Sequence, residues 1–340
     1  MKKIKVLIAG ANGYIGLELC KLLLNHKYVE ILYICGNTSV GKELFFYDNF
    51  FKGKNLPKIK KFNKIFLNKV DIVFTALPNG DAQKISKFLN QKNKLIDLSG
   101  DFRLQSASNY LRWYKRKHLA KKNINKSIYS LPEINMKNLK KYKIISCPGC
   151  YPTSILIPLI PLLKNKLIRS KNITIDSKSG YSGAGRKIHI KFKNKNLYES
   201  LSVYGVSNHK HNSEIQQELF KYINKKVNYN FTPHLIPMFR GIMTSMYTEL
   251  NYGSSPSKLI SCLKKFYKNS YFVKIMKKNV LLSTNSVINT NNCNISVCEL
   301  KEKNKVLIVS VIDNLIKGGS GQAIQNFNKL YNFKAKEGFK

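Results

Sequence analysis

The chain has few cysteines, few acidic residues and no long apolar run, and each shortage excludes a class of protein. Its 340 residues include 7 cysteines, which are too sparse for the disulfide framework of a small secreted domain. The most apolar segment, 155–163, contains two prolines and is far too short to cross a bilayer. No zinc-ligand spacing is present. We therefore expect a cytosolic chain with no membrane span and no metal.

Basic residues outnumber acidic ones by 59 to 18, which gives a formal net charge of +41. Such a charge suggests nucleic acid or another anionic partner. The lysines are spread among Asn, Ile, Tyr and Phe, and the denser stretches at 52–69 and 112–126 carry no recognisable nucleic-acid motif. We interpret the charge as compositional bias on a solvated surface, which also suits a phosphorylated substrate and cofactor. A basic nucleic-acid-binding protein remains the non-enzyme alternative.

The hydrophobic pattern predicts two domains, as the length also suggests. Apolar runs alternate with helical patterns in the first part, which indicates βαβ units and a Rossmann-type doubly wound parallel sheet. The predicted strands are 4–9, 29–34, 70–76, 94–98 and 143–146, and the predicted helices are 14–25 and 82–89. We assign residues 1–148 to this α/β domain.

The pattern changes after residue 148 to that of an α+β domain with a mixed sheet, assigned to 149–319. The predicted strands are 173–179, 243–250 and 306–312, and the predicted helices are 213–223 and 257–267. A last helix is predicted at 321–331. We expect this C-terminal segment, 320–340, to pack back on the first domain.

A glycine-rich loop joins the first strand to the first helix. Its glycines permit a tight turn and close approach of backbone to phosphate, and the helix N-terminus attracts the negative charge. The second strand ends without the carboxylate that an NAD site usually places there; hydroxyls and a lysine follow instead, which favours the 2′-phosphate of NADP(H). The predicted cofactor residues are Gly10, Asn12, Gly13, Tyr14, Ile15, Gly16, Thr38, Ser39 and Lys42.

Cys150 is the candidate nucleophile. It follows an apolar strand and a Pro-Gly turn, and a helix is predicted to begin one residue past the sulfur. A thiol at a helix N-terminus is favoured in its thiolate form, which attacks acyl groups. Cys147 and Cys150 also form a C-x-x-C pair, so a thiol–disulfide oxidoreductase that needs both cysteines is a further alternative.

Blocks along nearly the whole chain give it a specific resemblance. They are 10–16, 97–104, 148–153, 179–186, 209–214, 231–241 and 313–323. In these blocks the chain resembles the N-acetyl-gamma-glutamyl-phosphate reductases of arginine biosynthesis, and more distantly the aspartate-semialdehyde dehydrogenases. Blocks 97–104 and 209–214 disfavour the second family. The first family usually has Asn at the position of Cys147, and the effect of this difference stays open.

The resemblance implies a chemistry. The Cys150 thiolate attacks the acyl phosphate of N-acetylglutamyl 5-phosphate, phosphate leaves, and NADPH reduces the thioester to the 5-semialdehyde. By family position His209 exchanges the protons, with His211 as second choice. The implied substrate residues are Arg103, Arg186, His211, Glu214 and Arg240, and further cofactor residues are Ser182, Gly183, Gly185 and Asn314. A homodimer or homotetramer is also implied.

Three of these assignments have structural alternatives. Arg103 suits phosphate or carboxylate as a fork-shaped donor, and it equally suits an ion pair with Asp101. Arg240 has the same ambiguity. Asn314 follows a predicted strand, where an N-cap or turn role competes with binding of the nicotinamide amide.

Overall fold

The computed structural model describes residues 3–135, 137–186 and 199–339. The chain forms two compact units. Met1–Pro148 and Gly319–Lys340 make up the first, and Gly149–Gly318 makes up the second. The chain therefore enters the second unit one residue before Cys150.

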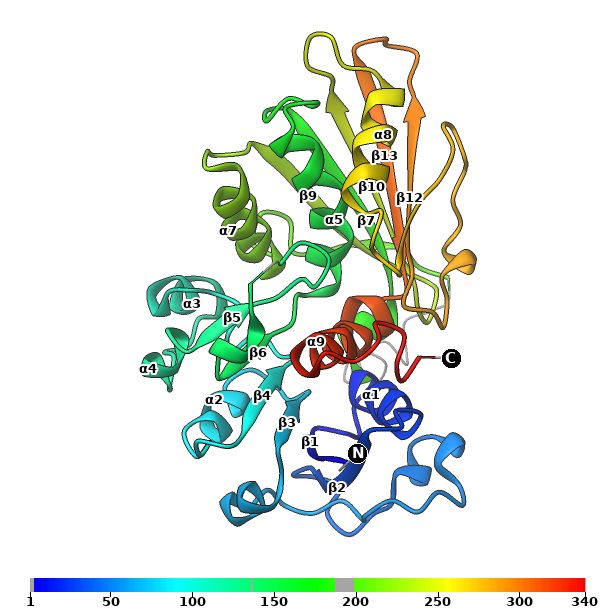
Figure 1. The fold of residues 1–340 in the computed structure, drawn as a ribbon. Helices are drawn as coiled ribbons and strands as arrows, with labels where there is room; N and C mark the ends of the chain where they lie inside the picture. Colours follow the sequence, from blue (N-terminus) through cyan, green and yellow to red (C-terminus); the bar gives the residue numbers. More distant parts are fainter. Residues whose placement is uncertain (1–2, 136, 187–198, 340) are drawn as a thin grey trace. The chain divides into compact units, whose positions relative to one another are not determined.

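The first unit is built on a six-stranded sheet in the order β2-β1-β3-β4-β6-β5, in which every pairing is parallel. Figure 1 draws these strands in blue to green. Their bounds are Ile4–Ala9 (β1), Val29–Cys35 (β2), Ile72–Thr75 (β3), Lys94–Asp97 (β4), Ser127–Tyr129 (β5) and Ile144–Ser146 (β6). The predicted doubly wound parallel sheet is confirmed.

Five helices accompany this sheet in the described part of the first unit: α1 (Tyr14–Leu24), α2 (Asp81–Ser86), α3 (Ala107–Tyr114), α4 (Lys121–Ile124) and α9 (Gly321–Tyr331). The C-terminal helix α9 packs against α1 and β4. Its inward face carries Phe327, which is fully buried, and Asn326, which accepts a 2.6 Å hydrogen bond from the Ser130 hydroxyl. The last helix is thus part of the first unit's core.

The second unit is built on a seven-stranded sheet in the order β11-β12-β13-β10-β7-β9-β8. The pairs β7–β9 and β11–β12 are parallel and the others antiparallel, so the mixed sheet is confirmed. The strands are Ile173–Gly180 (β7), Ser202–Val203 (β8), Tyr229–Ile236 (β9), Ile242–Glu249 (β10), Val273–Ile275 (β11), Cys293–Glu299 (β12) and Lys305–Ile312 (β13).

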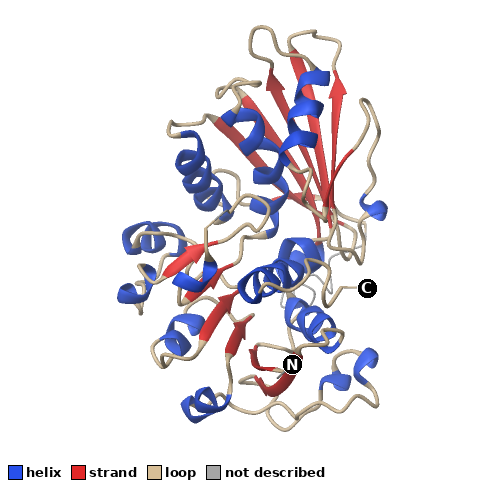
Figure 2. Cartoon of the chain, in the orientation of Figure 1, coloured by secondary structure: helices blue, strands red, loops and turns tan. Residues whose placement is uncertain are grey.

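Helices α5 (Cys150–Lys164), α7 (His211–Ile223) and α8 (Pro256–Phe266) lie together on one face of this sheet, as Figure 2 shows. The apolar run of α5 is wholly buried between the sheet and the other two helices. Gly149 is extended (φ −70°, ψ 163°), so helical geometry starts at Cys150 itself. The predicted start one residue after the sulfur is therefore wrong by one position. No helix in the described ranges is long and apolar enough to cross a membrane.

Two glycines fix the turn between β1 and α1. Gly10 has φ +91°, and a Cβ there would lie 2.4 Å from the Ala76 carbonyl oxygen. A Cβ at Gly16 would lie 2.2 Å from the Gly10 carbonyl oxygen. Both neighbours are backbone atoms, which cannot rotate away. A residue with a side chain at Gly10 or Gly16 would therefore force the backbone of this loop to move.

We predict that Gly16→Ala lowers the free energy of unfolding by about 1–3 kcal/mol, because the added methyl group overlaps backbone. Denaturant unfolding measures the change. Gly13→Ala is the matched control, since its nearest neighbour would lie at 3.7 Å, an ordinary contact. Equal stability of the two variants would contradict the close approach of Gly16 to the Gly10 carbonyl oxygen.

Candidate active site

The nucleophile candidate lies at the first residue of α5, where three segments of the second unit meet. Gly149 precedes it as the N-cap, and Gly318 lies beside it. A Cβ at Gly318 would come within 2.6 Å of the Cys150 Cβ. The half-buried thiol is therefore enclosed by backbone on one side. The helix N-terminus favours negative charge on its sulfur.

Glu214 holds the turn that leads into α5. Its side chain is fully buried on α7, and its Oε2 accepts a 2.9 Å hydrogen bond from the Gly149 N–H. Its Oε1 lies 3.9 Å from Nε2 of His211. The His211 ring in turn covers Gly149, where a Cβ would meet Nε2 at 2.3 Å. One buried carboxylate thus orders both the residue before the nucleophile and a neighbouring imidazole.

His209 and His211 lie edge to face, with ring centroids 4.8 Å apart. Nδ1 of His209 accepts a 3.2 Å hydrogen bond from the His211 backbone N–H. A neutral ring with an acceptor at Nδ1 carries its proton on Nε2. Burial, reinforced by the adjacent Lys210 charge, lowers the pKa of His209 to about 4, so this ring is neutral at pH 7 and its Nε2–H is a donor.

A cavity of about 380 Å³ brings these groups together. Cys150, His209 and His211 all line it, so the structure unites the three side chains that the sequence singled out for catalysis. Its wall also includes Gly183, which was predicted to contact the cofactor. The remaining lining residues are Tyr151, Ser179, Ala184, Tyr204, Gly205, Asn208 and Lys210.

Two tyrosines of this cavity were missed by the sequence reasoning. The Tyr151 ring packs edge-on against both His209 and His211, and its hydroxyl donates to the His234 carbonyl at 3.0 Å. The Tyr204 hydroxyl donates to Tyr151 at 3.1 Å. Tyr151 adjoins the nucleophile in sequence, and that position was the available signal. Tyr204 precedes His209 by five residues, and its role becomes visible only in three dimensions.

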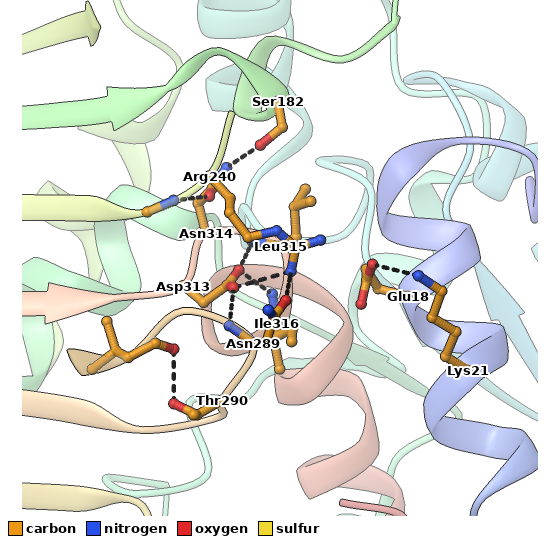
Figure 3. A network of polar contacts seen from close by, with 12 residues as sticks. Glu18, Lys21, Ser182, Arg240, Asn289, Thr290, Asp313, Asn314, Leu315 and Ile316 are labelled. Carbon is orange, nitrogen blue, oxygen red and sulfur yellow. Dashed lines mark hydrogen bonds and ion pairs between the residues drawn. The ribbon is translucent and has the colours of Figure 1, made fainter. Parts of the chain in front are cut away.

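Asn314 lies at the centre of a buried network in the second unit (Figure 3). Its Oδ1 accepts from the Gly241 N–H at 2.6 Å and its Nδ2 donates to the Ser182 hydroxyl at 2.9 Å. Nδ2 would also lie 3.4 Å from a Cβ at Gly183. Asn314 thus ties the 3₁₀ turn Tyr181–Ala184 to the loop after β9. Gly185 and the half-buried Arg186 follow this turn.

Arg240 belongs to an adjacent network in the same figure. Its Nη1 donates to Asp313 Oδ2 at 3.1 Å and to Asn289 Oδ1 at 2.8 Å. The fully buried Asp313 also accepts from the N–H groups of Asn289, Leu315 and Ile316. Arg240 therefore forms an ion pair with Asp313 that holds this loop. A structural ion pair was one of the two roles considered for Arg240 from the sequence.

The nucleotide loop lies in the first unit. The Asn12 side chain donates to the Ser39 hydroxyl at 2.8 Å, and Tyr47 donates to the same oxygen at 2.6 Å. The buried Ser39 thus connects the loop after β1 to the loop after β2, whereas Thr38 and Lys42 are exposed. Tyr14 and Ile15 open α1 and are half-buried.

The 97–104 block also lies in the first unit. Asp101 accepts hydrogen bonds from the Gly80 N–H, from Gln83 and from the Tyr110 hydroxyl. Arg103 is buried, and it donates to the carbonyls of Cys147 and Leu98, both at 2.9 Å. Arg103 therefore fastens the segment that follows β6, three residues before the nucleophile.

The class of protein is that of the semialdehyde dehydrogenases, because two family descriptions of that class match this chain. The family description "Semialdehyde dehydrogenase, NAD binding domain" matches residues 5–142, and "Semialdehyde dehydrogenase, dimerisation domain" matches residues 150–314. Among solved structures, aspartate semialdehyde dehydrogenase II from Vibrio cholerae aligns over 98% of this chain and 99% of its own, with a TM-score of 0.71 and 16% identity. The Candida albicans aspartate semialdehyde dehydrogenase with NADP gives a TM-score of 0.70 at 14% identity, over 97% of this chain and 99% of its own. At these identities the likeness shows the fold alone.

Sequence relatives define the family within that class. N-acetyl-gamma-glutamyl-phosphate reductase from Ehrlichia canis is 41% identical over 98% of this chain and 96% of its own length. The Ehrlichia ruminantium (strain Gardel) protein of the same name is 43% identical over 96% and 94%. The Clostridium novyi one is 41% identical over 98% and 97%. The chain belongs to the N-acetyl-gamma-glutamyl-phosphate reductase family.

We predict that Glu214→Ala changes the alkylation rate of Cys150 by iodoacetamide, because the Gly149 N–H that sets the start of α5 loses its acceptor. An unsatisfied buried donor costs about 1–3 kcal/mol of stability as well. Peptide mass spectrometry over time measures the alkylation. Glu218→Ala is the control, since Glu218 is also buried on α7 but pairs with Lys221 and Gln217. An unchanged rate in Glu214→Ala would contradict the positioning role.

We predict an acid-dependent loss of stability that originates at His209. The unfolded ring titrates near the ordinary pKa of 6.5 and the folded ring near 4. Between these values the unfolded chain binds a proton that the folded chain rejects, so stability is retained above pH 6.5 and falls on acidification towards pH 4. Wild type should therefore lose stability relative to His209→Gln across this window. Parallel denaturation profiles from pH 7 to 4.5 would contradict the burial effect.

Proposed function

We propose that this chain reduces N-acetylglutamyl 5-phosphate to N-acetylglutamate 5-semialdehyde with NADPH and releases phosphate. The observation that carries the proposal is the cavity in which Cys150, His209 and His211 meet, on a chain that belongs to the N-acetyl-gamma-glutamyl-phosphate reductase family. The relatives' name states the substrate and the reaction. The cavity supplies the nucleophile and proton carriers that this reaction needs.

The residues of the first unit fit an NADP-type cofactor. Gly10 and Gly16 leave room for backbone only, as a diphosphate-binding turn requires. β2 ends at Cys35, and the exposed Thr38 and Lys42 follow it with no carboxylate before Glu43, which suits a 2′-phosphate. When bound, NADPH supplies the hydride that reduces the acyl carbon. We assign the diphosphate to the loop after β1 and the 2′-phosphate to the loop after β2.

Cys150 carries the covalent chemistry in this proposal. Its thiolate attacks the acyl carbon, a C–S bond forms, and the C–O bond to phosphate breaks with the electron pair leaving on phosphate. After hydride addition the C–S bond breaks, the thiolate returns to Cys150, and the aldehyde is released. The positive end of α5 stabilises the sulfur anion at the start and at the end of the cycle.

The two histidines share the proton steps. His211 covers Gly149 beside the nucleophile and lies near the Glu214 carboxylate, which stabilises a positive imidazolium. We therefore assign to His211 the proton removed from the Cys150 thiol. His209 has its proton on Nε2 and its Nδ1 engaged, so we assign it as the donor to the carbonyl oxygen where negative charge develops.

Some of the remaining candidate residues line the cavity, and others position the loops around it. Lys210 lines the cavity, and Arg186 follows the turn that also lines it. We propose these two cations for the phosphate and carboxylate of the substrate. Arg103, Arg240 and Glu214 bind loop backbone or a neighbouring buried carboxylate. For these three a positioning role replaces the substrate contact that the resemblance implied.

The thiol–disulfide alternative is less well supported. Cys147 is 1% exposed, and burial raises its pKa to about 12. Its sulfur accepts a contact from Asn326 Nδ2 at 3.7 Å. A buried thiol of this kind is inert, whereas a redox dithiol needs an exposed thiolate. We therefore assign Cys147 to packing, where the family usually has Asn.

We also propose a homodimer or homotetramer in the cytosol. The matching description of residues 150–314 as a dimerisation domain supports the assembly, and the second unit's sheet is the proposed interface. The sparse cysteines, 7 in 340 residues, lack the spacing of a disulfide framework, which supports a reducing compartment. Light scattering that finds only a 39.0 kDa monomer at micromolar concentration would contradict the assembly.

We predict that Cys150→Ala lowers turnover at least ~10³-fold, because the covalent route is lost. The reverse reaction, with N-acetylglutamate semialdehyde, NADP⁺ and phosphate, is followed by NADPH absorbance. Cys262→Ala is the control for removal of another half-buried thiol, and Cys147→Asn should stay active. Turnover by Cys150→Ala, or turnover that does not depend on phosphate, would contradict the proposal.

A further inference from the structure

A second cavity, of about 1,020 Å³, lies in the first unit. Its lining comes from the end of α2, the loop into β4, residues 117–120, helix α4, and Lys126 and Lys143, which immediately precede β5 and β6. All strands of this sheet run in parallel, so their starts share one edge. The nucleotide loop follows the end of β1 and Cys147 follows the end of β6. The cavity is therefore at the opposite edge of the sheet from both.

The cavity wall is strongly basic. Six lysines line it and none of its 14 lining residues is acidic; the lysines are Lys87, Lys117, Lys121, Lys122, Lys126 and Lys143. The sheet itself forces some of them together, because Ser127 pairs with Ile144 and sets Lys126 beside Lys143. Burial and the charges of Lys94 and Lys126 lower the pKa of Lys143. Positive charge is thus crowded here, and a bound anion would relieve the repulsion.

The walls are tied together by hydrogen bonds. Asn123 Nδ2 on α4 donates to the carbonyl (3.1 Å) and the hydroxyl (3.0 Å) of Ser86 on α2. The Leu119 N–H donates to Gln83 Oε1 at 2.6 Å. Lys143 Nζ binds the carbonyls of Asn90 and Gln91. Figure 1 draws α2 in cyan and α4 in blue-green, close to each other as these bonds require. These bonds fix α2, α4 and the loop into β4 against one another, and the exposed lysines extend from that framework.

Part of the wall is apolar. Leu89, Leu119 and Ala120 line the cavity together with the lysines and with the side-chain amides of Asn90 and Gln91. Ligand sites in proteins commonly combine such an apolar area with a few fixed polar groups, at volumes of roughly 300–1,000 Å³. A simple inorganic ion would leave the apolar part unused.

From these features we propose that the cavity between α2, α4 and the starts of β4–β6 binds a small organic polyphosphate of the nucleoside triphosphate kind. The phosphates lie against Lys117, Lys121 and Lys122, and the organic group lies on Leu89 and Leu119. The site is separate from the cofactor loop and is independent of the proposed reaction.

The test uses the full-length protein and ATP as the probe, with calorimetry at about 150 mM salt to suppress unspecific attraction. The triple variant Lys117→Gln/Lys121→Gln/Lys122→Gln should bind ATP roughly tenfold more weakly or worse, since charge-assisted contacts to phosphate are lost. The control, Lys264→Gln/Lys265→Gln/Lys268→Gln, removes the same charge from the α8 region of the second unit and should bind as wild type does. The KM for NADPH should be unchanged in both.

Three outcomes would overturn the proposal. Equal weakening in both triple variants would mean that ATP responds only to net charge. ATP binding that competes with NADPH and ignores the Lys117/Lys121/Lys122 substitutions would place ATP in the cofactor site. If inorganic tripolyphosphate bound as tightly as ATP, the organic group would contribute nothing to binding, and the role of Leu89 and Leu119 would be contradicted. ATP binding several-fold tighter than tripolyphosphate, lost only in the first variant, would support it.

Discussion

The active site depends on the absence of side chains around the first turn of α5. Cβ atoms at Gly149 and Gly318 would lie 2.3 Å from the His211 imidazole and 2.6 Å from the Cys150 Cβ. The His211 imidazole therefore packs directly on Gly149, the residue before the nucleophile, and the Gly318 backbone packs directly on Cys150. This arrangement places a helix N-terminus, a thiol and a base in one small cavity, where the helix N-terminus favours the thiolate.

Three buried acidic residues of this chain serve as anchors for loop backbone. Buried Glu214 binds the Gly149 N–H, buried Asp313 binds the N–H groups of Leu315 and Ile316, and buried Asp101 binds that of Gly80. A carboxylate that accepts backbone N–H bonds remains stable when buried. In a chain with +41 net charge, these three loops are held by internal carboxylates.

The sequence predicted the strands and helices whose periodicity is long and regular. Helix Gly321–Tyr331 and strand Ile4–Ala9 have the predicted bounds, and β13 differs by one residue at its start. It missed β9 because Pro233 interrupts the run, and β12 because its first two residues belong to the polar, Asn-rich stretch 289–294. β5 and β11 have three residues each, too few to show a period. Cys150 was identified from its place between an apolar strand and a helix start, and His209 and His211 were identified from the resemblance. The roles of Glu214, Arg103 and Tyr204 depend on contacts that only the folded chain makes, with residues 65, 44 and 53 positions away.

The most direct test is to look for the covalent intermediate itself. Wild-type protein mixed with N-acetylglutamyl phosphate, without NADPH, is quenched in acid and digested, and the peptide that contains Cys150 is analysed by mass spectrometry. The account predicts an N-acetylglutamyl group on the Cys150 sulfur that forms within the turnover time and disappears when NADPH is added before the quench. Sustained turnover with no acyl group on that sulfur would contradict it.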